Sequence, residues 1–190
     1  MKDKWLLMSC ILAASCASPP VHYVSLEAQT SVAAMRADPT SIEIGPLAMP
    51  ASLERPQLVL SGGAGRLTVL EQTRWAGPLS RLVAQTLADD VSRDLGVSQV
   101  VAFPQLSGWP SQFKVLIEVH DLLGVPGERV HLDAGWRVLQ DGQPRAQGRF
   151  VRDEPCSEPG VDGVVAAHSR VLAAFAVQLA GALQPLLPMR

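Results

Sequence analysis

Apolar residues recur at every second position in four segments of the chain, at 41–45, 113–122, 129–139 and 145–151. A period of two is typical of a strand with one buried face. Turn sequences separate the last three segments, which are therefore predicted to form an antiparallel meander. Shorter strands are expected at residues 22–26, 57–60, 67–71 and 99–103, and the compact apolar run 99–103 is expected to be central in the sheet.

Glycine and proline mark the breaks between these strands. Pro46 and Pro50 are expected to end the strand at 41–45, and they indicate a sheet edge or an irregular exit from the sheet. The mixed, polar stretch 27–40 is predicted to be loop. The glycine-rich stretch 61–66 is interpreted as a hairpin turn, because it lacks the Lys-Ser/Thr pair of a phosphate-binding loop and a strand pattern follows it.

Two longer segments, 78–95 and 161–183, repeat their apolar residues with the period of an α-helix. Pro78 suits the first turn of the first helix, and Gly96 follows its end. Its solvated side is expected to carry Arg81, Gln85, Asp89, Ser92 and Arg93. Two long helices separated by strands indicate an α/β sandwich, in which a mixed, largely antiparallel sheet carries both helices.

The first residues have the pattern of a secretory signal: a charged start, an apolar run from Trp5, and small residues before Cys16. This order resembles the bacterial lipoprotein signal, in which the cysteine is acylated and becomes the new N-terminus. Such signals usually carry leucine three residues before the cysteine, where this chain has Ala13. Cys10 is less suitable, because only residues 5–8 would form its apolar core. A plain cleaved signal with an incidental cysteine is the alternative.

The expected division of the chain follows from this anchor. Residues 1–15 form the lipoprotein signal peptide, 16–21 the lipidated anchor and spacer, and 22–190 a single periplasmic domain. Several acyl chains on one N-terminus hold a protein stably on a membrane. Ala17 next to the cysteine, in place of aspartate, favours the outer membrane in bacteria that sort lipoproteins by this position. Residues 161–183 are not expected to span a membrane, because four polar or charged residues interrupt them.

Charge and cysteine content limit the classes of function. The chain carries 16 basic and 18 acidic residues, a formal charge of −2. Removing residues 1–15 takes away two lysines and one aspartate, which leaves 14 against 17 and a charge of −3. This balance does not predict a nucleic-acid-binding surface. Cys156 is then the one cysteine left besides Cys16, and it is interpreted as a solitary loop thiol, with an interchain disulfide as the alternative.

The sequence lacks the patterns of the common enzymes and metal sites. Its four histidines have no partner at metal-ligand spacing on a helix, and it contains no Cys-x-x-Cys or Gly-x-Ser-x-Gly motif. His120-Asp121 and His131-x-Asp133 have the composition of acid–base pairs, but alternation assigns them to a wet sheet face. His168 is interpreted as a core or interface histidine. The sequence predicts a non-enzymatic protein without catalytic, metal-binding or cofactor-binding residues.

Two segments are more unusual. Trp75-Ala76-Gly77-Pro78-Leu79 precedes the first helix, and residues 50–59 carry Leu53 and Arg55 among prolines. A tryptophan before a helix N-terminus typically packs as a hydrophobic staple. Arg55 is expected to hold a carboxylate or backbone carbonyls. A structural role is favoured for both segments, and a partner-binding surface is the alternative.

In this order and spacing, the motifs resemble the ABC-type transport auxiliary lipoproteins, the family that includes the Pqi (paraquat-inducible) outer-membrane lipoprotein. The resemblance covers essentially all of the mature chain. It rests on Cys16, Tyr23, Leu26, Ile42, Ile44, Gly45, Pro46, Pro50, Leu53, Arg55, Pro56, Gln57, Leu58, Val59, Arg74, Trp75, Ala76, Pro78, Leu79, Leu132, Ala134, Trp136 and Val138, and on the Ala/Leu-rich last helix. Gly77 departs from the family, which usually carries an acidic residue there, and this puts in doubt any polar contact made at that position.

The resemblance implies a non-enzymatic part of an envelope lipid-transport system. Its relatives work with periplasm-spanning proteins of the MCE (mammalian cell entry) type, and dock the outer-membrane end, in some cases as a homo-oligomeric ring. The adaptor hypothesis therefore has an MCE-type protein and the outer-membrane lipid surface as partners. The alternative is a self-contained lipid carrier, which predicts a cavity of several hundred Å³ between the sheet and the helices.

Overall fold

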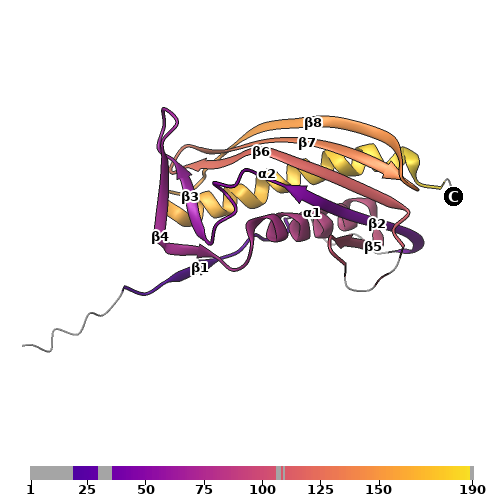
Figure 1. The fold of residues 1–190 in the computed structure, drawn as a ribbon, viewed down its shortest axis with the longest axis horizontal. Helices are drawn as coiled ribbons and strands as arrows, with labels where there is room; N and C mark the ends of the chain where they lie inside the picture. The colour runs from indigo at the N-terminus through magenta and orange to yellow at the C-terminus, as the bar shows by residue number, and fades with distance from the viewer. Residues whose placement is uncertain (1–18, 30–35, 106–107, 109, 189–190) are drawn as a thin grey trace, which may run out of the picture.

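The computed structural model describes residues 19–29, 36–105, 108 and 110–188 (Figure 1). The signal segment and Cys16 lie outside these ranges. Within them the strands are β1 (His22–Val24), β2 (Arg36–Ala48), β3 (Gln57–Ser61), β4 (Leu67–Trp75), β5 (Val97–Ala102), β6 (Phe113–Val125), β7 (Arg129–Gln140) and β8 (Gln143–Pro155). The helices are α1 (Leu79–Leu95), α2 (Gly160–Leu183) and a short 3-10 turn, η1 (Gln184–Leu186). This is the mixed α/β class predicted from the sequence.

Strand β6 organises the sheet. One edge of β6 pairs with β7 along its whole length, and β7 pairs with β8, which is the predicted antiparallel meander. The other edge is shared by two parallel neighbours, β2 near the start of β6 and β3 near its end. Strand β5 lies beyond β2, and β4 and β1 lie beyond β3. The sheet therefore divides into two branches on one side of β6, and β1 closes one of them.

Two predictions about strand position are wrong. Strand β5 pairs with β2 alone, so the apolar run near 99–103 forms an edge strand and not a central one. Strand β2 is flanked by β5 and β6 and continues past Pro46, so this proline neither ends the strand nor marks an edge. The register shifts between Ile44 and Leu47, and this irregularity accommodates the missing amide donor of the proline. The prediction of a loop over residues 27–40 is also wrong from Arg36 onwards, because residues 36–40 belong to β2.

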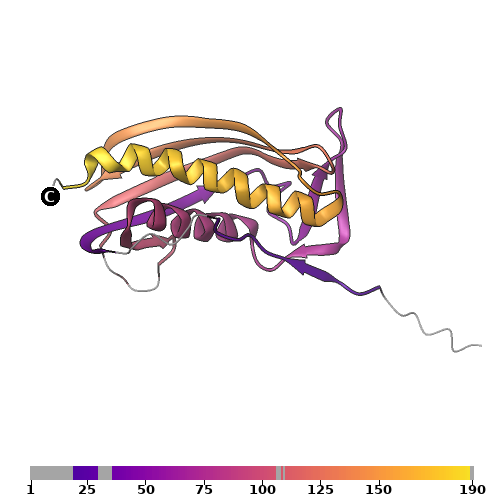
Figure 2. The same ribbon diagram turned by 180° about the vertical axis from the view of Figure 1, so that it is seen from behind.

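Both helices form where the sequence predicts them, and both cover one face of the sheet (Figures 1 and 2). Helix α1 ends at Gly96, which adopts the left-handed conformation with φ 65°. The prediction that Ser92 lies on the solvated side of α1 is wrong. Ser92 is buried, and its hydroxyl donates to the Val97 carbonyl at 2.7 Å. Helix α2 is joined to the edge strand β8 by Arg170, whose Nε donates to Glu154 at 3.0 Å.

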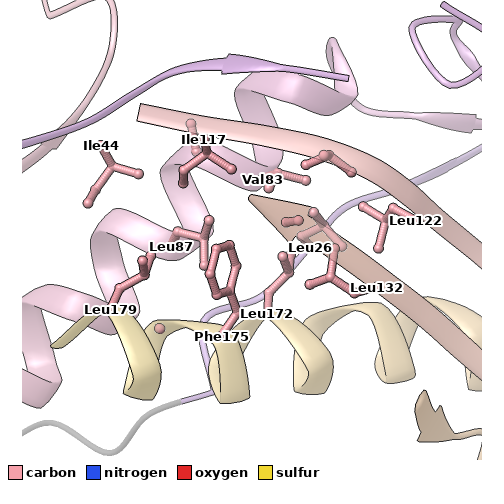
Figure 3. Packing of buried hydrophobic residues seen from close by; sticks show 14 of the residues in the cluster. Leu26, Ile44, Val83, Leu87, Ile117, Leu122, Leu132, Leu172, Phe175 and Leu179 are labelled. Carbon is pink, nitrogen blue, oxygen red and sulfur yellow. The ribbon is translucent and has the colours of Figure 1, made fainter. Parts of the chain in front are cut away.

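The layer between sheet and helices is filled by side chains. Leu87 of α1, Leu132 of β7, and Leu172 and Phe175 of α2 are 0–1% exposed and meet in the centre (Figure 3). Phe175 stacks on Phe150 of β8 with ring centroids 4.9 Å apart. Packing at the density of a protein interior leaves no room for a lipid between these residues. The core geometry thus favours the adaptor hypothesis over the carrier hypothesis.

The segment 160–186 is long and apolar enough to cross a membrane by length and composition, with a mean hydropathy of 1.4. Most of its apolar window is buried inside the molecule, however, where α2 packs on β6, β7 and β8. Its hydrophobicity is accounted for by the core.

The glycine-rich stretch 61–66 forms the predicted hairpin turn between β3 and β4. The Gly62 amide donates to the Arg66 carbonyl at 2.8 Å, and the Arg66 amide donates to Gly63 at 3.0 Å. Gly63 and Gly65 have φ values of 71° and 74°, which glycine adopts without a steric penalty. The hairpin lies at the end of the molecule opposite the C-terminus (Figure 1).

Candidate functional site

The two unusual segments of the sequence meet at one surface groove. The loop after β2 passes beside the end of β4, where the Trp75 amide donates to the Pro56 carbonyl at 2.8 Å. A groove of about 440 Å³ lies at this junction. It is lined by Glu54, Arg55, Pro56, Trp75, Ala76, Gly77 and Pro78, and we call it the Trp75 groove.

Local chemistry fixes both walls of the groove. On one side, the Leu53 amide donates to the Pro50 carbonyl at 2.9 Å and closes a turn that leaves Glu54 and Arg55 exposed. On the other side, Pro78 holds the chain extended, with φ −55° and ψ 128°, directly before α1 begins at Leu79. A proline at this place costs no helix hydrogen bond, since the first amides of a helix have no partner within it.

The groove adjoins the first strand of the described chain. Strand β1 runs parallel to the end of β4, with Val24 opposite Trp75. The Ala76 amide, in the wall of the groove, donates to the Val24 carbonyl at 2.8 Å. The groove is therefore attached directly to the segment that leads from the N-terminus into the domain.

Trp75 itself is buried, with 4% of its surface exposed, and only its border reaches the groove. Its indole meets the imidazole of His168 on α2 edge to face, with centroids 5.6 Å apart and ring planes at 70°. The His168 Nδ1 lies 2.8 Å from the Val164 carbonyl. Burial lowers the pKa of His168 from 6.5 to about 4, so this imidazole is neutral at pH 7.

The remaining sequence-predicted site residues lie away from the groove surface. Leu53 and Leu79 are 3% and 2% exposed and belong to the hydrophobic core beneath it. Trp136 is far along β7, buried opposite Gly148 of β8. The structure therefore brings together Arg55, Trp75 and Pro78 at one site, and it does not place Trp136 there.

Replacing Gly148 by alanine is expected to destabilise the fold by about 1–3 kcal/mol, the usual cost of overpacking. A Cβ at this position would stand 2.7 Å from Cζ2 and 2.9 Å from Cε2 of Trp136, so the indole would have to shift. Urea unfolding of the purified variant measures the loss. Gly181→Ala is the control, since its Cβ would meet nothing within 4 Å; equal losses in both variants would contradict this account.

The lining of the groove combines apolar and charged side chains. Its walls are the apolar surfaces of Pro56, Trp75 and Pro78, and the exposed charges of Glu54 and Arg55 lie at its rim. An apolar floor with a charged rim is typical of a surface that binds a partner side chain.

The surroundings of Gly77 leave room for a side chain at this position. A Cβ there would meet Leu82 alone among the described residues, at 3.9 Å, which is an ordinary contact. A Cβ at position 77 would therefore not be crowded, and in this chain position 77 adds no charge to the groove.

A larger hollow of about 620 Å³ lies on the opposite, helix-free face of the sheet, around Gly135. It is a depression along β6, β7 and β8 that reaches Ala48 at the end of β2, and Trp136 is among its lining residues. The same sheet face carries His131, whose Nδ1 lies 2.6 Å from Asp153, and His120, whose Nδ1 lies 3.4 Å from Asp133. The prediction that both histidines lie on the solvent-facing side of the sheet is correct. Each histidine, however, pairs with an aspartate on the neighbouring strand and not with the aspartate close to it in sequence.

On this face Arg149 pairs with Asp133. Its Nε donates to Asp133 at 2.8 Å, and this hydrogen bond is the main reason that the pKa of Asp133 falls to about 2.

Cys156, after β8, is half-buried, with its thiol 3.8 Å from the Val125 carbonyl, and burial raises its pKa. Neither this thiol nor the Arg149–Asp133 pair adjoins the Trp75 groove.

Comparison with known proteins identifies the group to which this fold and groove belong. The family model for the ABC-type transport auxiliary lipoprotein component matches residues 24–180. The chain belongs to this family. The auxiliary lipoprotein fold therefore includes every strand from β2 to β8 and most of α2, together with all residues of the Trp75 groove. A search of curated proteins found no significant match.

Solved structures share the fold of this auxiliary lipoprotein. An uncharacterised protein aligns with a TM-score of 0.65 at 20% identity, over 88% of this chain and 99% of that one. A protein from Xanthomonas campestris aligns with a TM-score of 0.65 at 15% identity, over 86% and 93%. PelC from Paraburkholderia phytofirmans, crystallised as a dodecamer, aligns at 0.45 with 13% identity, over 85% and 95%, a likeness too distant to indicate how this chain assembles.

Sequence reasoning missed two neighbours of the groove in the auxiliary lipoprotein. His168 was assigned to the core, which is correct, but nothing in its helical pattern indicated Trp75 as its ring partner. The position of β1 against β4 was also missed, because a parallel pairing of three residues leaves no local signal. Both contacts join segments far apart in the sequence.

Proposed function

We propose that this chain is a lipid-anchored, non-enzymatic adaptor of an MCE-type envelope lipid-transport system, Pqi-like in organisation and held at the periplasmic face of the outer membrane. Cys16 carries the acyl chains, residues 16–21 form the anchor and spacer, and the domain from 22 onwards binds the periplasm-spanning partner. Membership of the ABC-type transport auxiliary lipoprotein family supports the transport role. In this role the adaptor helps to maintain the outer membrane.

The observation that carries the proposal is the convergence of Arg55, Trp75 and Pro78 in one groove beside β1. These residues come from two separate segments that had been singled out from sequence, and the fold joins them next to the strand that follows the anchor. A partner bound in the Trp75 groove is then held close to the membrane, where an effective local concentration strengthens weak binding. A homo-oligomeric ring would present several such grooves together.

Arg55→Glu is expected to lower co-purification with the MCE-type partner by about tenfold or more, the range for reversing a charge at a binding rim. Arg55 is exposed, so the fold is expected to change in stability by no more than about 0.5 kcal/mol. Arg145→Glu, at an exposed position on β8 remote from the groove, is the matched control. Equal recovery of the partner with both variants would contradict a docking role for the groove.

Cys16→Ser is expected to abolish incorporation of radioactive palmitate into the protein, because the thiol of Cys16 is the proposed acceptor. Cys10→Ser and Cys156→Ser are the matched controls and are expected to retain labelling. Retained labelling in Cys16→Ser would place the acyl group elsewhere. Absence of labelling in the unaltered chain would favour the plain cleaved signal instead.

A further inference from the structure

Large apolar side chains are exposed at the end of the molecule where the chain enters the domain. Val21, Tyr23 and Leu67 are 37%, 68% and 45% exposed, and they make up half of the large hydrophobic residues with this degree of exposure in the described ranges. Val21 and Tyr23 belong to the entry into β1, which pairs with the last residues of β4, whereas Leu67 is the first residue of β4, after the β3–β4 hairpin turn. The exposed apolar residues therefore lie at the two ends of β4. Both views show these elements at the end opposite the C-terminus (Figures 1 and 2).

The covalent chain limits how far this end can lie from an acylated Cys16. An extended chain covers at most about 3.6 Å per residue, so Val21 lies within about 18 Å and Tyr23 within about 25 Å of the cysteine. Pro19-Pro20 stiffens the last part of this connection, since proline restricts the backbone. The polar layer on each side of a bilayer is about 5–8 Å thick. Tyr23 is therefore within reach of the headgroups.

The side chains at this end suit a lipid interface. A tyrosine ring combines an apolar body with a polar hydroxyl, and tyrosines concentrate at the headgroup level of membranes for this reason. Arg66 stands next to Leu67, and an arginine places its stem on apolar surface while its guanidinium contacts phosphate. His22 lies between Val21 and Tyr23 and is also exposed. The combination of aliphatic, aromatic and basic groups matches a phospholipid surface better than bulk water.

We propose that this end of the domain, with Val21 and Tyr23 beside one end of β4 and Arg66 and Leu67 at the other, rests against the phospholipid headgroup layer, with Tyr23 as its interfacial aromatic residue. This inference rests on the proposed acylation of Cys16, and it adds the orientation of the domain relative to the membrane. The first strand then stands at the membrane, the Trp75 groove beside β1 lies near the headgroups, and the C-terminal end of α2 points away into the periplasm. The occupant of this surface is the lipid itself.

Tyr23 is the single tyrosine of the chain, which makes a direct test available without mutation. Biosynthetic incorporation of 3-fluorotyrosine places one fluorine label at residue 23. The processed, membrane-extracted protein is reconstituted into phosphatidylethanolamine/phosphatidylglycerol vesicles that contain a headgroup-spin-labelled phospholipid. The fluorine resonance of Tyr23 is expected to relax several-fold faster with the spin label than without it.

The control moves the single tyrosine to a comparably exposed site at the far end. Tyr23→Phe combined with Val177→Tyr places the label in the last third of α2, at a position that is 60% exposed. Several-fold greater relaxation at residue 23 than at residue 177 supports the proposed orientation. Equal relaxation at both sites, in protein that floats with the vesicles, overturns the orientation while the anchor stands. Protein that does not float overturns the anchor and the orientation together.

Discussion

Trp75→Ala is expected to reduce the free energy of unfolding by about 3–5 kcal/mol, the range for removing a buried tryptophan from a core. The indole is 96% buried, so its loss leaves a cavity between β4 and α2 and exposes the edge of His168 to an empty space. A typical domain is stable by only about 5–15 kcal/mol, so the variant is close to the limit of folding. Urea unfolding of the mature chain carrying Cys16→Ser measures the change.

A conservative variant separates packing from partner binding at the same place. Trp75→Phe retains a ring beside His168 and is expected to cost only about 1–2 kcal/mol. Arg55→Ala, at an exposed position in the same groove, is expected to leave stability within about 0.5 kcal/mol. A loss of less than about 1 kcal/mol in Trp75→Ala would mean that the indole contributes little to the fold and is present for binding alone.

Acidification from pH 6.5 to pH 4 is expected to destabilise the protein by about 3 kcal/mol through His168. Burial lowers the pKa of this imidazole to about 4 in the folded state, whereas it is near 6.5 when the chain is unfolded. Between these values the unfolded chain binds the proton and the folded chain does not. Stability contributed by neutral His168 is therefore complete above pH 6.5 and is lost as the pH falls towards 4.

The measurement is the free energy of unfolding in urea at a series of pH values between 7 and 4. His168→Leu, which fills a similar volume without titrating, is expected to show a flatter profile over this range. His22→Gln, at an exposed position on β1, is the control and is expected to keep the original slope. An unchanged slope in His168→Leu would assign the acid sensitivity to other groups. Below pH 4 the carboxylate of Asp133, with its lowered pKa, becomes the next group to contribute.

Local patterns predicted the elements well because each element depends on its own residues. The helices α1 and α2 were expected within one residue of their observed starts and end where predicted, since their apolar period, their prolines and Gly96 are all local signals. The meander β6–β7–β8 follows from alternation and two turns, and it is sequential in space as well. The interpretation of His168 as a core residue also needed only its place on the apolar face of α2.

Errors arose wherever position depends on partners remote in sequence. The run near 99–103 is as apolar as a central strand, yet β5 lies at an edge because α1 covers its face and supplies the burial. Pro46 would end an isolated strand, but β5 and β6 hold β2 from both sides and absorb the proline as a register shift. Alternation alone contains no information on which strand lies next to which.

Periodicity and turn residues were sufficient to define the elements and the α/β class, and the N-terminal pattern predicts acylation of Cys16. The folded chain was needed to learn that Arg55, Trp75 and Pro78 share one groove, that Trp136 lies outside it, and that β1 adjoins the groove at the entry of the chain. Periodicity and turn chemistry act over a few residues, whereas the groove depends on contacts between distant segments. These contacts are the hydrogen bond between Trp75 and Pro56 and the ring contact between Trp75 and His168.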